Sequence, residues 1–180
     1  MMIKTIFSGF GGQGVLMMGY SLAHSAMNKG FHVTYLPSYG AEVRGGTANC
    51  TIAVADEEIT SPVASEPDYL VVMNSPSLTT FQNKITPGGT IFLNSSIVDV
   101  RPSRQDVKIC AVPCGDMAQD LGNIRVANII MMGAFIKKTG IIPADIYLKS
   151  LGTIMGSKKK SVAEINQRAF AAGYDFVKDK

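Results

Sequence analysis

Short apolar runs alternate along the chain with segments whose apolar residues recur at helical spacing. Residues 3–7 form such a run, and residues 15–28 carry an apolar face, which predicts a strand followed by a helix. The same reasoning predicts further strands at 32–37, 47–55, 68–74, 90–93 and 107–112, and further helices at 76–85, 115–121, 124–138, 143–155 and from 161 onward. Strands that alternate with helices favour a three-layer α/β fold.

One connection is too short for a parallel crossover. Residues 56–58 lead directly from the strand at 47–55 into Ile59, which predicts an antiparallel hairpin at that place. The strand at 107–112 is the last one expected, and the remainder of the chain is expected to be helical. We therefore expect a single domain over 1–180, with an α/β core at about 1–140 and C-terminal helices at about 141–180. Its sheet should be Rossmann-like and mostly parallel, with the hairpin added.

The composition indicates which kinds of partner and which cellular compartment to expect for this chain. Charged residues make up 17% of the chain, against about 25% in ordinary globular proteins. This low fraction indicates either surface covered by a partner or only a small α/β core. The net charge of +3 comes without a basic stripe interleaved with aromatic residues, so we expect no nucleic-acid partner. Three cysteines fit neither a disulfide framework nor a zinc site, and they favour reduced thiols in the cytoplasm. The longest apolar run, at 126–136, is too short to span a bilayer, so we expect no membrane segment.

A glycine-rich turn joins the first predicted strand to the first predicted helix. Its spacing is G-x-G-x-x-G, formed by Gly9, Gly11 and Gly14, with Gly12 and Gln13 inside it. Backbone N–H groups of such a turn, together with the positive end of the helix dipole, form an anion site. The turn therefore indicates a phosphate-bearing ligand, or else only close packing of helix on sheet.

A second polar stretch follows the second predicted strand. Its candidate residues are Tyr39, Gly40, Glu42, Arg44, Gly45 and Gly46. Loops at the carboxyl ends of strands line the ligand crevice of open α/β sheets. Arg44 could present a guanidinium fork to a phosphate or carboxylate, or only order its own loop. Glu42 is the first carboxylate after the strand, so the ribose-binding acid of a dinucleotide site is missing from that strand's end.

A third candidate group lies at the start of the long apolar helix. Asn123, Arg125 and Asn128 are polar residues in an apolar setting, on neighbouring helical faces. They could line the ligand crevice or a subunit interface. A solvent-facing stripe is the competing interpretation.

Together these stretches resemble the gamma subunit of 2-oxoacid:ferredoxin (acceptor) oxidoreductases. The resemblance rests on SGFGGQG at 8–14, PSYG at 37–40, RGGTANC at 44–50 and LGNIR at 121–125, with Glu42, Asn128 and Gly133. It covers about residues 3–175. The stretch around Arg44 is most similar to the 2-oxoglutarate branch, while the branched-chain 2-oxoacid and pyruvate branches stay open.

The resemblance implies a complex that oxidatively decarboxylates a 2-oxoacid, with 2-oxoglutarate favoured. Its products would be an acyl-coenzyme A, carbon dioxide and a reduced ferredoxin or other acceptor. Thiamine diphosphate, Mg and an iron–sulfur cluster would belong to alpha and beta subunits and to a ferredoxin-like delta subunit where present. Coenzyme A would be a co-substrate.

The resemblance assigns this chain no catalytic residue, no metal and no cofactor of its own. Its expected part is assembly of the complex and shaping of the active-site entrance. It could also contact coenzyme A, and residues 11–14 and 44–46 are the expected functional surface. Arg44 could meet a phosphate of coenzyme A or a carboxylate of a partner subunit. The isolated chain is expected to be inactive and could form a homodimer through surface meant for its partners. Two alternatives are a free-standing nucleotide-binding Rossmann-like protein and a purely structural interaction subunit.

Overall fold

A single mixed sheet forms the centre of the molecule. The computed structural model describes residues 1–40, 46–156 and 160–178. Its strands are β1 (Met2–Phe10), β2 (His32–Tyr39), β3 (Thr47–Ala55), β4 (Tyr69–Val72), β5 (Thr90–Asn94) and β6 (Lys108–Val112). Their order across the sheet is β2-β3-β1-β4-β5-β6. β1, β4, β5 and β6 run parallel, and β3 is antiparallel to both β1 and β2. The predicted α/β fold with a mostly parallel sheet is confirmed.

The antiparallel hairpin is present, but the predicted partner of its strand is wrong. β3 pairs with the preceding strand, β2, in a register that places Ala48 opposite Tyr39. Its other edge pairs with β1. Both edges of β3 are therefore hydrogen-bonded, which leaves no edge at which Ile59 could add a strand. Residues 56–68 contain no strand.

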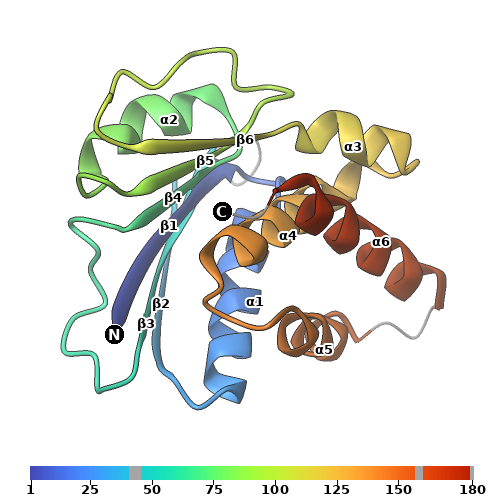
Figure 1. Cartoon of the computed structure of the whole chain (residues 1–180), viewed down its shortest axis with the longest axis horizontal. Helices are drawn as coiled ribbons and strands as arrows, with labels where there is room; N and C mark the ends of the chain where they lie inside the picture. Colours follow the sequence, from blue (N-terminus) through green and yellow to red (C-terminus); the bar gives the residue numbers. More distant parts are fainter. Residues whose placement is uncertain (41–45, 157–159, 179–180) are drawn as a thin grey trace.

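Helices cover both faces of the sheet, with more of them on one face than on the other (Figure 1). They are α1 (Val15–Asn28), α2 (Ser75–Phe81), α3 (Cys114–Asp120), α4 (Ala127–Thr139), α5 (Ala144–Met155) and α6 (Lys160–Phe176), with short 3-10 helices η1 (Gln82–Lys84) and η2 (Ile124–Val126). Figure 1 shows α2 on one side of the sheet and α1, α4, α5 and α6 on the other. The helix expected at 124–138 begins as η2, because Asn123 accepts a hydrogen bond from the N–H of Arg125 and caps that tighter turn.

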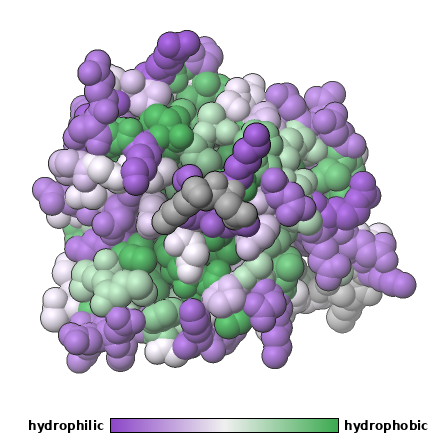
Figure 2. Space-filling view, viewed as in Figure 1, coloured by the Kyte–Doolittle hydropathy of each residue, from purple (hydrophilic) through white to green (hydrophobic). Residues whose placement is uncertain are grey.

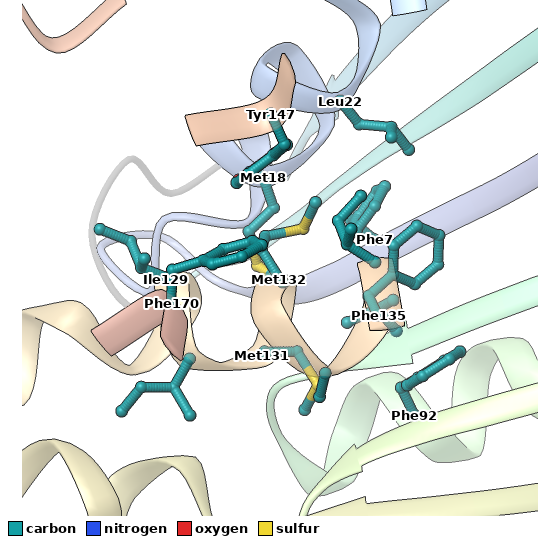
Figure 3. Close-up of a cluster of buried hydrophobic side chains, with 14 of the residues drawn as sticks. Phe7, Met18, Leu22, Phe92, Ile129, Met131, Met132, Phe135, Tyr147 and Phe170 are labelled. Carbon is teal, nitrogen blue, oxygen red and sulfur yellow. The ribbon is translucent and has the colours of Figure 1, made fainter. Parts of the chain in front are cut away.

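Two hydrophobic clusters fill the space between the sheet and these helices. Phe7 points toward the larger cluster and Ile6 toward the smaller one under α2, as the alternation of side chains along a strand requires. In the larger cluster, the ring of Phe135 from α4 lies 5.5 Å from that of Phe7 and 5.2 Å from that of Phe92, centroid to centroid. Figure 3 shows these rings together, so α4 is the helix that anchors the helical layer on the sheet.

The C-terminal helix α6 packs on α4 through two glycines. A Cβ atom at Gly173 would lie 1.8 Å from the carbonyl oxygen of Ile130, and one at Gly133 would lie 2.2 Å from that of Phe170. Only residues without side chains permit this approach of two backbones. Each helix therefore supplies a glycine at the point where the other helix comes closest.

The outer surface is mixed in character. On the face seen in Figure 2, apolar side chains gather in several patches between hydrophilic ones. Exposed apolar residues include Met27 and Ile124, each 63% exposed. Across the described ranges, every helix is too short or too polar to cross a bilayer.

Candidate functional site

The glycine-rich turn occupies the junction between β1 and α1. Gly14 is the N-cap of α1 with φ +74°, and Gly12 has φ +100°, both in the left-handed region that favours glycine. The N–H of Gly11 donates to the carbonyl of Gly46 over 2.9 Å. Within the described part of the chain, the N–H groups of Gly12 and Gly14 donate to no protein acceptor. These two donors and the positive end of the α1 dipole give the turn the chemistry of an anion site.

Gln13 fixes the turn to the end of β4. Its Oε1 accepts the N–H of Phe10 over 2.7 Å, and its Nε2 donates to the carbonyl of Met73 over 2.9 Å. A Cβ atom at Gly9 would come within 2.6 Å of the Gln13 Oε1. Gly9 thus makes room for this side chain, and the pair holds the turn in place.

Two cavities flank the turn. The loop cavity has a volume of about 430 Å³ and lies between the turn and the β2–β3 end, where it is lined by Gly11, Gly12, Gly14, Tyr39, Gly40 and Gly46 among others. The strand-end cavity has a volume of about 300 Å³ and is lined by Gly12, Gln13, Met73, Asn94, Arg125 and Asn128 among others. Gly12 lines both, so the N–H groups of the turn lie between two spaces that could hold one ligand.

The predicted polar residues around Arg125 lie beside the glycine turn. A Cβ atom at Gly14 would be 2.3 Å from the Asn128 Nδ2, so the amide of Asn128 covers this glycine directly. Asn123 Oδ1 accepts the N–H of Arg125 over 3.1 Å and orients the segment. The Arg125 side chain is exposed at the rim of the strand-end cavity. A sequence segment more than a hundred residues away thereby joins the turn.

The second polar stretch is described only in part. Tyr39 is 71% exposed at the end of β2, and the N–H of Gly40 donates to the carbonyl of Thr47 over 2.7 Å. The structure thus brings Tyr39, Gly40 and Gly46 to the loop cavity. Glu42, Arg44 and Gly45 lie outside the described residues.

Two buried asparagines of this region escaped the sequence reasoning. Asn74 follows β4, accepts the N–H of Ser77 to cap α2, and donates to the Gln13 Oε1 over 3.3 Å. Asn94 ends β5 and lines the strand-end cavity. Each is an asparagine at the carboxyl end of an apolar strand, which is the signal that could have identified them.

The thiols near the site act as packing groups. Burial raises the pKa of Cys50 to about 12, so this thiol is neutral at physiological pH. Burial also raises the pKa of Cys114. Within the described ranges, no three His, Cys, Asp or Glu residues are grouped as a metal site would require. The described site instead offers backbone N–H groups, side-chain amides and one guanidinium, all suited to hold an anion or a polar ligand.

The strand order bears on dinucleotide binding. In a dinucleotide-binding sheet, the second strand lies directly beside the first, and the acid at its end reaches the ribose. Here β3 separates β2 from β1. The end of β2 is therefore displaced by one strand from the glycine turn, and the usual ribose position does not exist.

Comparison with known proteins places the chain in a family. The family described as pyruvate ferredoxin/flavodoxin oxidoreductase matches residues 4–176. The chain belongs to this family.

The relatives of this chain within the family are named for different substrates. It is 33% identical to ketoisovalerate oxidoreductase subunit VorA of Methanothermobacter thermautotrophicus over 98% of its length, and it spans 37% of that relative. It is 31% identical to 2-oxoglutarate synthase subunit KorC of Methanothermobacter marburgensis, covering 94% of each chain. A solved structure, the keto/oxoacid ferredoxin oxidoreductase gamma subunit from Geobacter sulfurreducens, superposes with a TM-score of 0.81 at 25% identity over 96% of each chain. These matches confirm the resemblance to gamma subunits.

Proposed function

We propose that this chain is the gamma-type subunit of a cytoplasmic complex that oxidatively decarboxylates a 2-oxoacid. The complex would convert the 2-oxoacid and coenzyme A to acyl-coenzyme A and carbon dioxide, and pass the electrons to ferredoxin or another acceptor. The observation that carries the proposal is the similarity to KorC over 94% of both chains, a match between proteins of similar length. Alpha and beta subunits, with a delta subunit where present, would supply thiamine diphosphate, Mg and the iron–sulfur cluster.

The substrate is the finer part of the proposal. We favour 2-oxoglutarate, because the stretch around Arg44 is most similar to that branch. Identity alone does not rank the substrates, since the ketoisovalerate and 2-oxoglutarate relatives differ by only 33% against 31%. The test is to purify the tagged chain from its native host and assay the eluate with 2-oxoglutarate, ketoisovalerate and pyruvate, each with coenzyme A and a low-potential dye. Co-elution of larger subunits with dye reduction is expected, fastest with 2-oxoglutarate.

For this chain we propose a contact with coenzyme A at the glycine turn. The N–H groups of Gly12 and Gly14, which have no acceptor among the described residues, lie at the start of a 14-residue helix and suit a phosphate oxygen. Arg44 would add a guanidinium from the neighbouring loop. In the assembled complex, Arg44→Ala should raise the KM for coenzyme A and leave that for the 2-oxoacid unchanged. An Arg44→Ala complex with an unaltered KM for coenzyme A would remove Arg44 from the contact.

A second candidate, a free-standing nucleotide-binding protein, is favoured by the same two N–H groups, which no acceptor in the described part of the chain engages. The displaced end of β2 argues against it. Titration of the isolated chain with NAD, FMN and ATP decides between them, and we expect no binding. Elution of the chain alone from gently lysed cells, combined with saturable binding of any of these nucleotides, would favour the second candidate. A purely structural subunit would show unchanged kinetics in assembled Arg44 and Gly12 variants.

A further inference from the structure

A third cavity lies among the helices, and no glycine of the turn lines it. This four-helix cavity has a volume of about 330 Å³ and is bounded by residues of α1, α4, α5 and α6. The volume falls at the lower end of the range for small-molecule sites, about 300–1,000 Å³. It therefore suits a small organic molecule better than a nucleotide.

Methionines form much of its wall. Met17, Met18, Met132 and Met155 line it, four of the ten methionines in the chain. Figure 3 shows Met18 and Met132 in the cluster that also contains Ile129 and Tyr147. Thioether side chains adapt their shape to apolar ligands, so this wall suits a flexible apolar body.

One amide in the wall has a weak protein partner. Asn166 of α6 is only 7% exposed, and its Nδ2 donates to the sulfur of Met155, a weak acceptor, over 3.0 Å. No described residue donates to its carbonyl oxygen. Among the described residues, the fully buried side-chain polar atom without a partner is Thr34 Oγ1, so the Asn166 oxygen keeps access to solvent. An amide oxygen that has no protein donor and belongs to a residue lining an apolar cavity can accept a hydrogen bond from a ligand there.

The other buried polar pair in the wall, Ser21 and Tyr147, is already hydrogen-bonded within the protein. Ser21 Oγ donates to the carbonyl of Met18 over 2.9 Å, so the hydroxyl of Tyr147 is the donor in the 2.9 Å contact between the two side chains. Both hydroxyl hydrogens are therefore used. Asn166 therefore differs from Ser21 and Tyr147, because its carbonyl oxygen can still accept a hydrogen bond from a ligand in the cavity.

A positive group lies at the rim. Arg125 lines the four-helix cavity and has an exposed side chain. Within the described residues, its guanidinium has no carboxylate partner. Arginine pairs well with carboxylates through its fork of donors. The cavity thus has an apolar wall, an anion-binding group at its rim and an amide inside it.

We propose that the four-helix cavity binds a small amphipathic carboxylate. Its apolar body lies against the methionines, its carboxylate pairs with Arg125, and a second polar group, such as a hydroxyl, bonds to Asn166. The four-helix cavity shares Arg125 and Asn128 with the strand-end cavity, but no glycine of the turn lines it, and the proposal does not rest on the coenzyme A contact. Binding involves no chemical step.

The test titrates the full chain by calorimetry with 8-hydroxyoctanoate, octanoate and octan-1-ol. We expect saturable binding of one 8-hydroxyoctanoate per chain. Octanoate lacks the hydroxyl and octan-1-ol lacks the charge, so each should bind about three- to tenfold more weakly, as the loss of one hydrogen-bonding group predicts. Absence of saturable binding by all three at millimolar concentration overturns the proposal.

Two variants locate the site. Arg125→Gln should weaken both carboxylates about fivefold, as expected for an exposed pair, and leave octan-1-ol unaffected. Arg168→Gln removes the same charge from an exposed position of α6 and should change nothing. Equal binding by the Arg125→Gln and unmodified chains overturns the assignment of the carboxylate.

Asn166→Leu separates a binding role from a structural one. It should abolish the preference for 8-hydroxyoctanoate over octanoate while raising the Tm, because it removes a poorly bonded buried amide. A merely structural asparagine would instead lower the Tm on replacement. Retention of the hydroxyl preference in Asn166→Leu contradicts the proposed contact.

Discussion

The two left-handed glycines of the turn allow a direct test of how Asn128 shapes the site. Gly12 and Gly14 both have positive φ, so an alanine at either position suffers backbone strain of about 1–2 kcal/mol. A Cβ atom at Gly12 would meet nothing within 4 Å, whereas one at Gly14 would lie 2.3 Å from the Asn128 Nδ2. Moving that amide forfeits its packing and hydrogen bonding, roughly another 1 kcal/mol. Gly14→Ala should therefore cost about 2–3 kcal/mol in total.

Urea denaturation of the isolated chain, followed by circular dichroism, measures both variants. The matched background is Asn128→Ala, which removes the amide that the new methyl group would strike. In that background Gly14→Ala should cost about the same as Gly12→Ala, which gives a coupling energy of about 1 kcal/mol between positions 14 and 128. If Gly14→Ala is no worse than Gly12→Ala, or if Asn128→Ala restores nothing, the close approach does not explain the glycine.

Three further predictions concern stability. Gln13→Ala leaves three backbone and side-chain groups without their partner and should cost about 2–4 kcal/mol in urea denaturation; a loss below 1 kcal/mol would mean that water replaces the side chain. Gly173→Ala forces a methyl group against the carbonyl of Ile130 and should lower the free energy of unfolding by at least about 3 kcal/mol. The control Gly152→Ala places its methyl group in open space on α5 and should raise the free energy of unfolding by roughly 0.5–1 kcal/mol. Similar Tm shifts in the two variants would contradict the close backbone contact. Because burial raises the pKa of Cys50 to about 12, its thiol ionises near pH 9 only in the unfolded chain, so stability should fall as pH rises from 9 to 12. The fall should exceed that of Cys50→Ala by up to about 1.4 kcal/mol per pH unit, and parallel pH profiles would refute the neutral buried thiol.

Local patterns predicted most of the secondary structure. The expected helix at 15–28 coincides with α1, because its apolar spacing and the following glycine are local signals. The pairing of β3 was not predictable in this way. The residue pattern of a strand indicates which of its faces is buried, but it does not indicate which strands will pair with its edges. Both strands that pair with β3 precede it in the chain.

The candidate site also combines features that local sequence predicts with contacts that only the tertiary structure determines. The glycine turn was recognisable from its spacing, and the structure puts Asn128 against it. That contact depends on how α4 crosses the start of α1, which no local pattern encodes. Asn166 was missed for a related reason: the sequence does not show that this residue of α6 faces a cavity between packed helices.

The glycine pair at the crossing of α4 and α6 has a consequence for how this chain can change over generations. A side chain that grows too large can usually be accommodated when a neighbouring side chain shrinks. At Gly133 and Gly173 the opposing atoms are the backbone carbonyls of Phe170 and Ile130, which no substitution can shorten. A mutation at either glycine therefore has no nearby compensating mutation, and selection for suppressors should return only true revertants or changes that shift the whole of α6.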